Sequence, residues 1–459
     1  MKKSFFKVCT MSFTLALGIL LSCSTGNREG RKFYASQCGA VLNSDVYKGG
    51  GADDTDALQA ILDKAPRLGR LHLVLDGAAR TSRPLIIHSN TTIECPDKSC
   101  GLFLSDGSDC SMLRNADCDM ETIRNYNITL IGGVYNHNSP GQVHHRKNGD
   151  DIFDWVFATE FYGIENFLMR DVTIANQRTW AMAMANWKHV TMENIHIDRR
   201  ERVDGQNQDG LHFWGPGRFL NLQNIRGNSG DDFIALAPDE IDFKSSIEDV
   251  LIQGVQLDEA DQGIRMLVRG EGKLDRVIVR DVTGTYRHFG FFISPYFSGK
   301  GGHYGNIVFD MIDLRPMKYN YSWRPFLFRI AGNIESMTFK NIYQHTPEFD
   351  HQMFILGGYG REYETGVEYD SHEQPSHINR VIVDGLYIDE RCEEGIPDTY
   401  FLVRGRVDLL SVKNVILRRH DVGNTKRGSL IRKDGGSLGE LQLIDINENC
   451  LKTVYDAGK

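Results

Sequence analysis

A short pattern that returns about every 30 residues constrains this chain more than any other feature. Each copy alternates apolar and polar residues, reaches a corner residue that is Asn, Asp or Gly in nine of ten copies, and then alternates again. The corner residues are Asp171, Asn194, Asn224, Gly254, Asp281, Met311, Asn341, Gly385, Asn414 and Asp445. Successive corners are 23, 30, 30, 27, 30, 30, 44, 29 and 31 residues apart. Alternation is typical of β-strands, and a near-constant period indicates stacked supersecondary units.

A second strand recurs between these copies with the same period. Its copies are residues 180–184, 209–213, 232–236, 262–266, 289–293 and 326–330. Two or three short strands in each turn of about 30 residues predict an all-β fold, a single-stranded parallel β-helix (solenoid). A β-propeller is the main alternative, but its blades need about 40–45 residues and four strands.

The composition agrees with a coil of this kind. The chain of 459 residues has 46 Gly and only 12 Pro, which suits many tight corners between strands that cannot lose backbone N–H groups. We expect Asn residues to stack inside the coil, where they would satisfy one another's amides. The net charge is −9 and no Lys/Arg-rich run occurs, so a dedicated nucleic-acid binder is excluded.

The first residues predict export from the cytoplasm. Lys2 and Lys3 precede an apolar stretch at 13–21 that is too short to span a membrane and typical of a signal peptide. Residues 20–23 (LLSC) resemble a bacterial lipobox. We therefore expect lipidation of Cys23 and a lipid-anchored protein of the bacterial cell envelope, on the periplasmic or surface face of the outer membrane. Ordinary signal cleavage with an incidental Cys23 is the alternative.

The domain plan follows from these segments. We expect a signal peptide at 1–22, a tether at 23–42 and one β-helix catalytic domain at 43–459. Within it, the turn at 49–56 leads to a short amphipathic helix at 57–62, with Thr55 as its N-cap. Such a helix would cover the open end of the coil, where strand edges and core are otherwise exposed.

Seven of the nine cysteines follow the leader, and disulfides are permitted outside the cytoplasm. The close pairs Cys95/Cys100 and Cys110/Cys118 are the expected disulfides. Metal binding is the weaker interpretation, because the cysteines lack a C-x-x-C repeat. We expect no metal and no cofactor.

Aligning the second strands by their apolar residues predicts which side chains face outward. The inward set is Leu211, Phe213, Ile234, Leu236, Ile264 and Met266. Side chains alternate across a strand, so His212, Ala235 and Arg265 would share the outer face. We expect His212 and Arg265 to be substrate-binding residues beside a groove on that face.

The same alignment brings three acids together. Asp209 and Asp232 start neighbouring strands, Asp231 is one residue earlier, and rungs lie about 4.8 Å apart. Carboxylates this close repel, so at least one pKa should rise, which allows chemically identical groups to divide general-acid and general-base roles. The alternative is that Asp beside Gly only marks turns.

At these motifs the chain resembles glycoside hydrolase family 28, the polygalacturonase-like enzymes. The matching segments are 51–56 (GADDTD), 207–210 (NQDG), 230–235 (GDDFIA) and 263–265 (GIR). The resemblance implies a right-handed parallel β-helix and inverting hydrolysis. It also implies Asp231 as the general acid, with Asp209 and Asp232 holding the attacking water, which needs carboxyl groups about 6.5–9.5 Å apart.

Two departures from the family pattern bear on the substrate. Residues 237–243 (APDEIDF) stand near the place of the family's Gly-His-Gly, for which His212 is a candidate substitute. The family's Arg-Ile-Lys becomes 265–267 (RML), which loses the lysine that faces a uronate carboxylate. A modified pectic side chain, another acidic glycan and a neutral sugar all remain open.

Further residues are candidates for sugar recognition. Trp180 and Trp214, with Phe292, have rings that suit sugar faces, although packing under loops is the alternative. Arg199, Arg200 and Arg202 are candidates for anion recognition, with a solvated charge run as the default. The long spacing between Asn341 and Gly385 indicates an insertion that could wall a groove.

The leading hypothesis is therefore a monomeric, lipid-anchored glycoside hydrolase acting on a polysaccharide or oligosaccharide. One alternative is a polysaccharide lyase on the same scaffold, with an Asp cluster binding Ca²⁺ and Arg265 as base. The other is a glycan-binding β-helix without catalysis.

Overall fold

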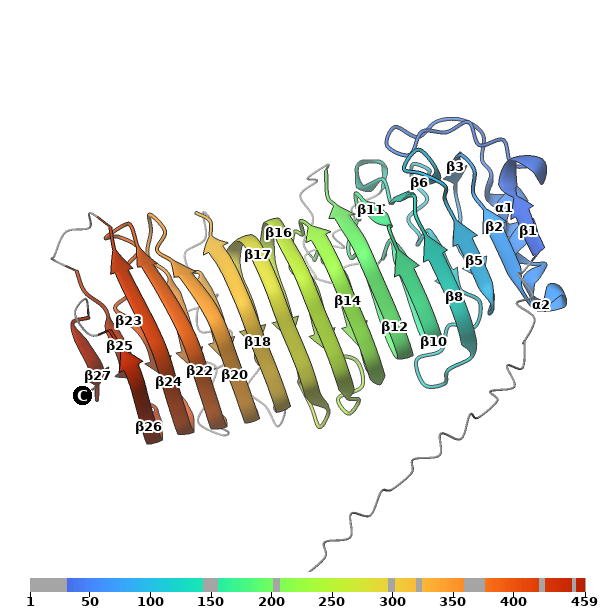
Figure 1. Cartoon of the computed structure of the whole chain (residues 1–459). Helices are drawn as coiled ribbons and strands as arrows, with labels where there is room; N and C mark the ends of the chain where they lie inside the picture. Colours follow the sequence, from blue (N-terminus) through green and yellow to red (C-terminus); the bar gives the residue numbers. More distant parts are fainter. Residues whose placement is uncertain are drawn as a thin grey trace, which may run out of the picture.

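The computed structural model describes residues 31–142, 156–200, 207–295, 302–318, 324–358, 376–420, 426–447 and 451–458. Within these ranges the chain winds into an elongated coil whose strands lie side by side from one end to the other (Figure 1). Neighbouring strands pair in parallel along the coil. The fold is a right-handed parallel β-helix, as the repeat and the resemblance predict. The leader and Cys23 lie outside the described residues.

The longest stack of strands runs the length of the coil. Its members, in order, are β1 (Arg31–Tyr34), β2 (Leu71–Val74), β5 (Thr91–Glu94), β8 (Asn125–Ile131), β10 (Thr159–Arg170), β12 (Met182–Asp198), β14 (Gly217–Gly227), β16 (Ile247–Met266), β17 (Lys273–Ile293), β18 (His303–Pro316), β20 (Asn333–His345), β22 (His377–Glu390), β24 (Arg406–Arg419) and β26 (Ser437–Ile446). Copies of the sequence repeat form the strands of this stack from β10 onward.

The second strands predicted from the sequence form another stack beside it. Its separate members are β4 (Leu85–Ile87), β7 (Leu113–Asn115), β13 (Leu211–Trp214), β15 (Asp232–Ala237), β19 (Phe326–Ile330), β21 (Gln352–Leu356), β23 (Thr399–Val403), β25 (Ser429–Lys433) and β27 (Thr453–Asp456). The first residues of β10 and β12 and the last residues of β16 and β17 complete this stack.

A third stack is separate only in the first coils. Its members are β3 (Ala78–Thr81), β6 (Gly101–Leu104), β9 (Val134–Asn136) and β11 (Thr173–Ala175). β11 then pairs with the last residues of β12, so that from β12 onward the first and third strands merge into one long strand. The turns that follow this third strand come before the second-strand stack, and this row of turns carries the candidate site.

The corner residues lie where these long strands bend. All ten corners predicted from the repeat have positive φ, between 51° and 87°, which confirms the prediction of their position. Nine are Asn, Asp or Gly, the residues that adopt the left-handed region at least cost. Met311 holds the same conformation, with φ of 57°.

The prediction of stacked Asn residues inside the coil is confirmed in part: the buried Asn176 donates to Asn136 Oδ1 on the neighbouring rung (3.3 Å), but the ladder at the corners lies outside. The Asn194 side chain donates to Asp171 Oδ1 (2.8 Å), and Asn224 donates to Asn194 Oδ1 (3.1 Å), on the exposed surface. The left-handed residue adds one outward position to the alternation. Apolar residues on both sides of the bend therefore keep pointing inward, and the corner itself faces solvent.

Stacked side chains of like kind fill the interior. Phe291, Phe328, Phe354 and Phe401 lie on successive rungs, with ring centroids 4.7, 4.9 and 4.5 Å apart and planes within 11° of parallel. This spacing follows from the distance between paired strands, about 4.8 Å. The register of the coil is thereby fixed by its core as well as by its backbone ladders.

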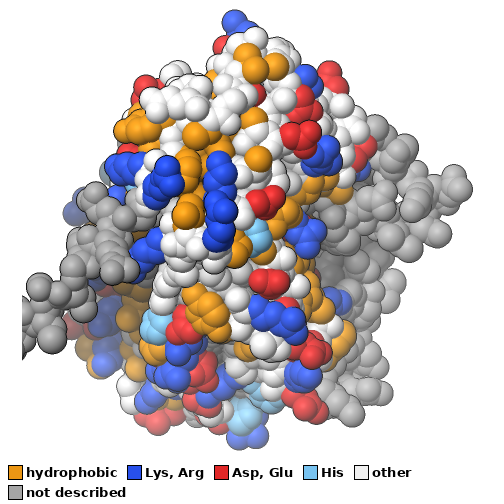
Figure 2. Space-filling view, turned by 90° about the vertical axis from the view of Figure 1, so that its right-hand side faces the viewer, with side chains coloured by type: hydrophobic (Ala, Val, Ile, Leu, Met, Phe, Trp, Pro, Cys, Tyr) orange, Lys and Arg blue, Asp and Glu red, His pale blue; other side chains and the backbone are white. Residues whose placement is uncertain are grey.

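Two short helices, α1 (Thr55–Leu62) and α2 (Ala65–Leu68), cover the N-terminal end, where α1 buries Leu58, Ile61 and Leu62. The predicted N-cap is wrong by one residue, because Asp54 precedes the helix and the Thr55 N–H donates to Asp53 Oδ1 (2.9 Å). Lys and Arg side chains lie beside Asp and Glu side chains across this end (Figure 2).

The structure differs from the sequence analysis in two further respects. β1 pairs with β2, so residues 31–34, which were assigned to a tether at 23–42, belong to the coil. Cys38, Cys95, Cys100, Cys110, Cys118 and Cys392 are free thiols, so neither predicted disulfide is formed. Burial raises the pKa of Cys95 to about 12 and that of Cys110 to about 11, and both thiols stay protonated. No helix in the described ranges is long and apolar enough to cross a membrane.

Candidate active site

The second-strand stack brings the predicted acids together in the predicted register. Leu211 of β13 pairs with Ile234 of β15, which pairs with Ile264 of β16. The Gly210 N–H, next to Asp209, donates to the carbonyl of Asp232 (2.9 Å). Asp209 and Asp232 therefore lie on adjacent rungs, with Asp231 immediately before Asp232.

Glycine permits this close approach of the rungs. A Cβ on Gly210 would lie 2.3 Å from the carbonyl oxygen of Phe233, and a Cβ on Gly263 would lie 2.2 Å from that of Gly290. Backbone atoms cannot yield at such distances. The Asp-Gly and Gln-Gly pairs at these strand starts thus have a structural cause that is independent of chemistry.

Burial raises the pKa of all three acids, and the charge of Asp209 adds to the rise at Asp231 and Asp232. The pKa of Asp231 lies well above its usual range, because burial is reinforced by the charges of Asp209 and Asp232. Burial and the charge of Asp209 raise the pKa of Asp232 to about 8. Such carboxyl groups can carry a proton near neutral pH.

A fourth acid in the cluster was not predicted. Asp232 pairs with Gln262, so Asp261 occupies the rung beside Asp231. Burial raises the pKa of Asp261 to about 6, and its charge adds to the shift of Asp231. The alignment that placed Gln262 beside Asp232 carried this signal, since Asp261 precedes Gln262 as Asp231 precedes Asp232.

One carboxylate oxygen of this cluster has no hydrogen-bond donor. Within the described residues, Asp232 Oδ1 is buried and makes no hydrogen bond. A buried carboxylate oxygen of this kind gains stability from any donor that reaches it. The described ranges contain no group of three or more His, Cys, Asp or Glu side chains that could hold a metal ion.

His212 lies beside Asp209 but faces protein groups. Its Nδ1 lies 2.8 Å from Asp209 Oδ2, and its Nε2 lies 2.9 Å from Glu240 Oε2. The ring is 3% exposed. Neither nitrogen remains for a sugar hydroxyl, so the structure does not favour the predicted substrate contact of His212.

Glu240 was also missed, although it lies in the segment that replaces the Gly-His-Gly. The buried Asp239 accepts hydrogen bonds from the N–H groups of Arg269 and Gly270, both at 2.6 Å, which fixes this turn after β15. Glu240 then accepts from the Trp214 indole N–H (2.8 Å) as well as contacting His212. Its position on the turn gives no periodic signal, so sequence reasoning could not find it.

The predicted sugar-stacking rings form a buried cluster. Trp180 is 4% and Trp214 8% exposed, with ring centroids 5.1 Å apart, and Phe157 stacks on Trp180 at 4.7 Å. Arg265 lies over the ring of Phe292, with its guanidinium carbon 3.9 Å from the centroid. These side chains line the outer face as predicted, but packing takes most of their surface.

The two described arginines that were predicted to recognise an anion, Arg199 and Arg200, differ in exposure and contact protein groups. Arg199 is buried and donates to Gln208 Oε1 (2.8 Å); Gln208 is the residue directly before Asp209. Arg200 is exposed, pairs with Asp198 (2.9 Å) and lies over the Tyr47 ring at 4.0 Å. Arg202 lies outside the described residues.

A pocket of about 650 Å³ lies on the same row of turns, toward the N-terminal end. Ser105, Asn138 and Asn176 belong to turns that follow β6, β9 and β11, as Asp231 belongs to the turn between β14 and β15. The pocket wall also includes Lys48 and Arg80. The acids and this pocket thus share one edge of the coil.

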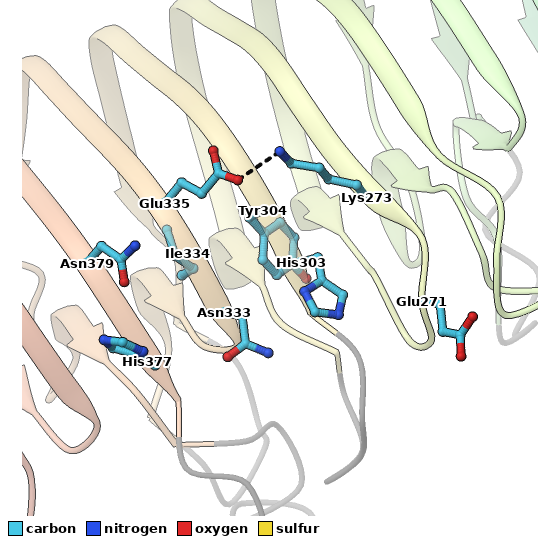
Figure 3. A pocket seen from close by; sticks show the side chains of 9 residues that line it. All are labelled: Glu271, Lys273, His303, Tyr304, Asn333, Ile334, Glu335, His377 and Asn379. Carbon is cyan, nitrogen blue, oxygen red and sulfur yellow. Dashed lines mark hydrogen bonds and ion pairs between the residues drawn. The ribbon is translucent and has the colours of Figure 1, made fainter.

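A second pocket, of about 460 Å³, lies near the start of β17, β18, β20 and β22 (Figure 3). Lys273 and Glu335 form an ion pair of 2.8 Å across it, and His303, Asn333 and His377 occupy successive rungs. Asp209, Asp231, Asp232 and Asp261 do not line this pocket.

No family model and no curated protein matches this chain. Solved structures do match. A hyperthermoactive exopolygalacturonase from Thermotoga maritima aligns with a TM-score of 0.51 and 13% identity, covering 90% of this chain and 92% of the enzyme. A family 28 exopolygalacturonase from Yersinia enterocolitica aligns with a TM-score of 0.54 and 10% identity, over 94% and 78%.

A third solved structure is the catalytic domain of a GH87 α-1,3-glucanase in complex with nigerose. It aligns with a TM-score of 0.50 and 10% identity, over 89% of this chain and 67% of that domain. At these identities the similarity is one of fold. The chain has the β-helix fold that carbohydrate-active enzymes use.

Proposed function

We propose that this chain is a glycoside hydrolase that cleaves a complex polysaccharide by inverting general acid/base hydrolysis. One observation carries the proposal: Asp209, Asp231 and Asp232 meet on adjacent rungs, where burial raises all three pKa values and the charge of Asp209 adds to the rise at Asp231 and Asp232. The similarity to polygalacturonase and α-1,3-glucanase structures supports a glycan as the substrate class.

Asp231 is the proposed general acid, which passes its proton to the glycosidic oxygen as the bond to the anomeric carbon breaks. Asp209 and Asp232 orient a water molecule, and one of them takes its proton as the water oxygen attacks that carbon. A single displacement of this kind inverts the anomeric configuration. The orphan Oδ1 of Asp232 supports a water-binding role for this residue.

The row of turns supports an extended substrate. The pocket lined by Asn138, Asn176 and Arg80 lies along the coil from the acids and offers hydrogen-bonding groups for sugar hydroxyls. Lys48 and Arg80 outnumber the single acid of the pocket wall, Asp106, and this balance suits a glycan that carries negative charge, such as a pectic or other acidic polysaccharide. Arg265, close enough to act on the pKa of Asp231 and Asp232, is the proposed substrate contact on the other side of the acids.

The test is a screen of the purified protein against plant and host glycans, with the product anomer followed by NMR. We expect hydrolysis with inversion, and a loss of at least about 10³-fold in the Asp231→Asn variant. Asp56→Asn, at an exposed acid of the cap, is the matched control. Retention of configuration would contradict the inverting assignment, an unsaturated product would indicate a lyase, and no conversion of any glycan would favour a binding protein.

The sequence supports a lipid anchor at Cys23, which would place a monomeric enzyme on the bacterial outer membrane. Metabolic labelling with a fatty acid tests this. We expect label on the wild type and none on Cys23→Ala, whereas label on neither would indicate ordinary signal cleavage.

A further inference from the structure

His212 is held between two carboxylates that come from neighbouring turns of the coil. Asp209 precedes β13, whereas Glu240 follows β15, and each lies within 2.9 Å of one ring nitrogen. A neutral imidazole has a single N–H, and an imidazolium has two. Only the charged ring can therefore donate to both carboxylates at once, so the geometry favours the imidazolium.

We infer that Glu240 and His212 are positioning residues that hold Asp209 ionised and correctly oriented. The inference rests on the proposed function, because it assigns a purpose to Asp209 in that reaction. Glu240 sets the charge of His212, and His212 in turn supplies a positive charge and a hydrogen bond to Asp209. Neither residue needs to touch the substrate.

The groups around Asp209, His212 and Glu240, here called the relay, agree with the inference. Trp180 stacks on the His212 ring at 3.7 Å with planes 4° apart, which fixes its orientation. Trp214 donates to Glu240 (2.8 Å), and Arg269 lies 4.0 Å from the other oxygen of Glu240. Within the described residues, Asp231, Asp232 and Arg265 also interact with these charges.

His212 and Glu240 keep their charges over a wide pH range. Burial opposes the imidazolium, but the bonds to Asp209 and Glu240 outweigh it and raise the pKa of His212 to about 9. Burial likewise opposes ionisation of Glu240, and the bond and charge of His212 lower its pKa to about 2. Between these values Glu240 and His212 are both charged.

This arrangement gives Asp209 and Asp231 different tendencies to hold a proton. Burial raises the pKa of Asp209, and His212 counteracts that rise. Asp231 instead experiences burial and the charges of Asp209, Asp232 and Asp261, all of which favour its protonated form. Protons are thereby directed to Asp231, the proposed acid, and away from Asp209, one of the two residues proposed to hold the water.

The experiment is Glu240→Gln, which keeps the shape and removes the charge. NMR of protein with isotopically labelled histidine follows His212, assigned with His212→Gln. We expect a wild-type midpoint near 9 and a decrease of at least about one pH unit in Glu240→Gln. Asp209→Asn should lower the midpoint too. Glu335→Gln, which breaks an ion pair elsewhere, is the matched control and should change nothing.

Kinetics on the converted glycan completes the test. Glu240→Gln should lower kcat about 10-fold with little change in KM and should shift the pH–rate profile, which a merely structural role would not do. A wild-type midpoint near 6.5, or one that Glu240→Gln leaves unchanged, overturns the relay. Full activity of Glu240→Gln beside an inactive Asp231→Asn overturns the positioning role alone. If no glycan is converted, the proposed function and this role fall together, while the titration still reports the charge of His212.

Discussion

Trp180 and His212 lie face to face, with ring centroids 3.7 Å apart and planes 4° from parallel. Trp180 reaches this position from the rung before that of His212, so the contact ties two coils together at the acids. The indole covers one face of a ring whose two nitrogens are bound by Asp209 and Glu240. The orientation of His212 is therefore fixed by packing and by hydrogen bonds together.

The pH dependence of stability should report the charge on His212. Its pKa is raised from 6.5 to about 9, so the stabilisation is fully present below pH 6.5 and is lost as pH rises to about 9. His212→Gln should cost about 2–3 kcal/mol at pH 6 and much less at pH 9.5. Thermal unfolding at both pH values measures this. The same substitution at the exposed His189 should have little effect at either pH, and a cost that did not vary with pH would contradict the assignment.

Removal of the Asp232 charge should stabilise the fold at high pH. Burial and the charge of Asp209 raise the pKa of Asp232 from 3.8 to about 8, so ionisation destabilises the fold as pH rises through this range. Asp232→Asn should raise the Tm by about 2–4 °C at pH 9 and leave it nearly unchanged at pH 4. Calorimetry of both proteins measures this, with Asp56→Asn as the control. A lower Tm at pH 9 would mean that Asp232 is stabilised as an anion.

The corner at Met311 should accept a better residue. Met311 has a φ of 57° and is 52% exposed, between the corners Asp281 and Asn341. Met311→Asn should stabilise the protein by about 1 kcal/mol, because Asn tolerates the left-handed region better. Met120→Asn, at an exposed methionine that is not a corner, is the control for the change of side chain. Equal Tm shifts in both variants would show that backbone conformation is not the cause.

The phenylalanine stack should be sensitive to cavities. Phe328 lies between Phe291 and Phe354, with centroids 4.7 and 4.9 Å away, and is fully buried. Phe328→Ala should destabilise by about 3–5 kcal/mol, whereas Phe328→Leu, which keeps most of the volume, should cost less. Denaturant unfolding ranks the two. Equal costs would indicate that the stack is loosely packed.

Much of the fold could be predicted because a coil repeats its own geometry. The period placed the strands, the corners and the register that pairs Ile234 with Leu211 and Ile264. The same logic placed Asp209, Asp231 and Asp232 on adjacent rungs. Two predictions failed in whole or in part: the Asn ladder at the corners faces solvent, and the predicted cysteine pairs are free thiols.

Residues without a periodic position needed the tertiary structure. Glu240 stands on a turn whose shape depends on Asp239 and its bonds to the chain 30 and 31 residues later. Sequence alone could not show that this turn folds back to His212. The sequence alignment of the strands could have predicted Asp261, because Asp261 precedes Gln262 as Asp231 precedes Asp232.

By itself the sequence determined the class of fold and the meeting of three acids, since alternation and period are local properties that add up along a coil. Only the tertiary structure decided what His212 does. The hydrogen bonds of a side chain depend on where distant segments pass, and here two carboxylates and an indole from three turns converge on one ring. His212, which was predicted to face a sugar, has both ring nitrogens within hydrogen-bonding distance of protein carboxylates, the observation on which the proposed relay rests.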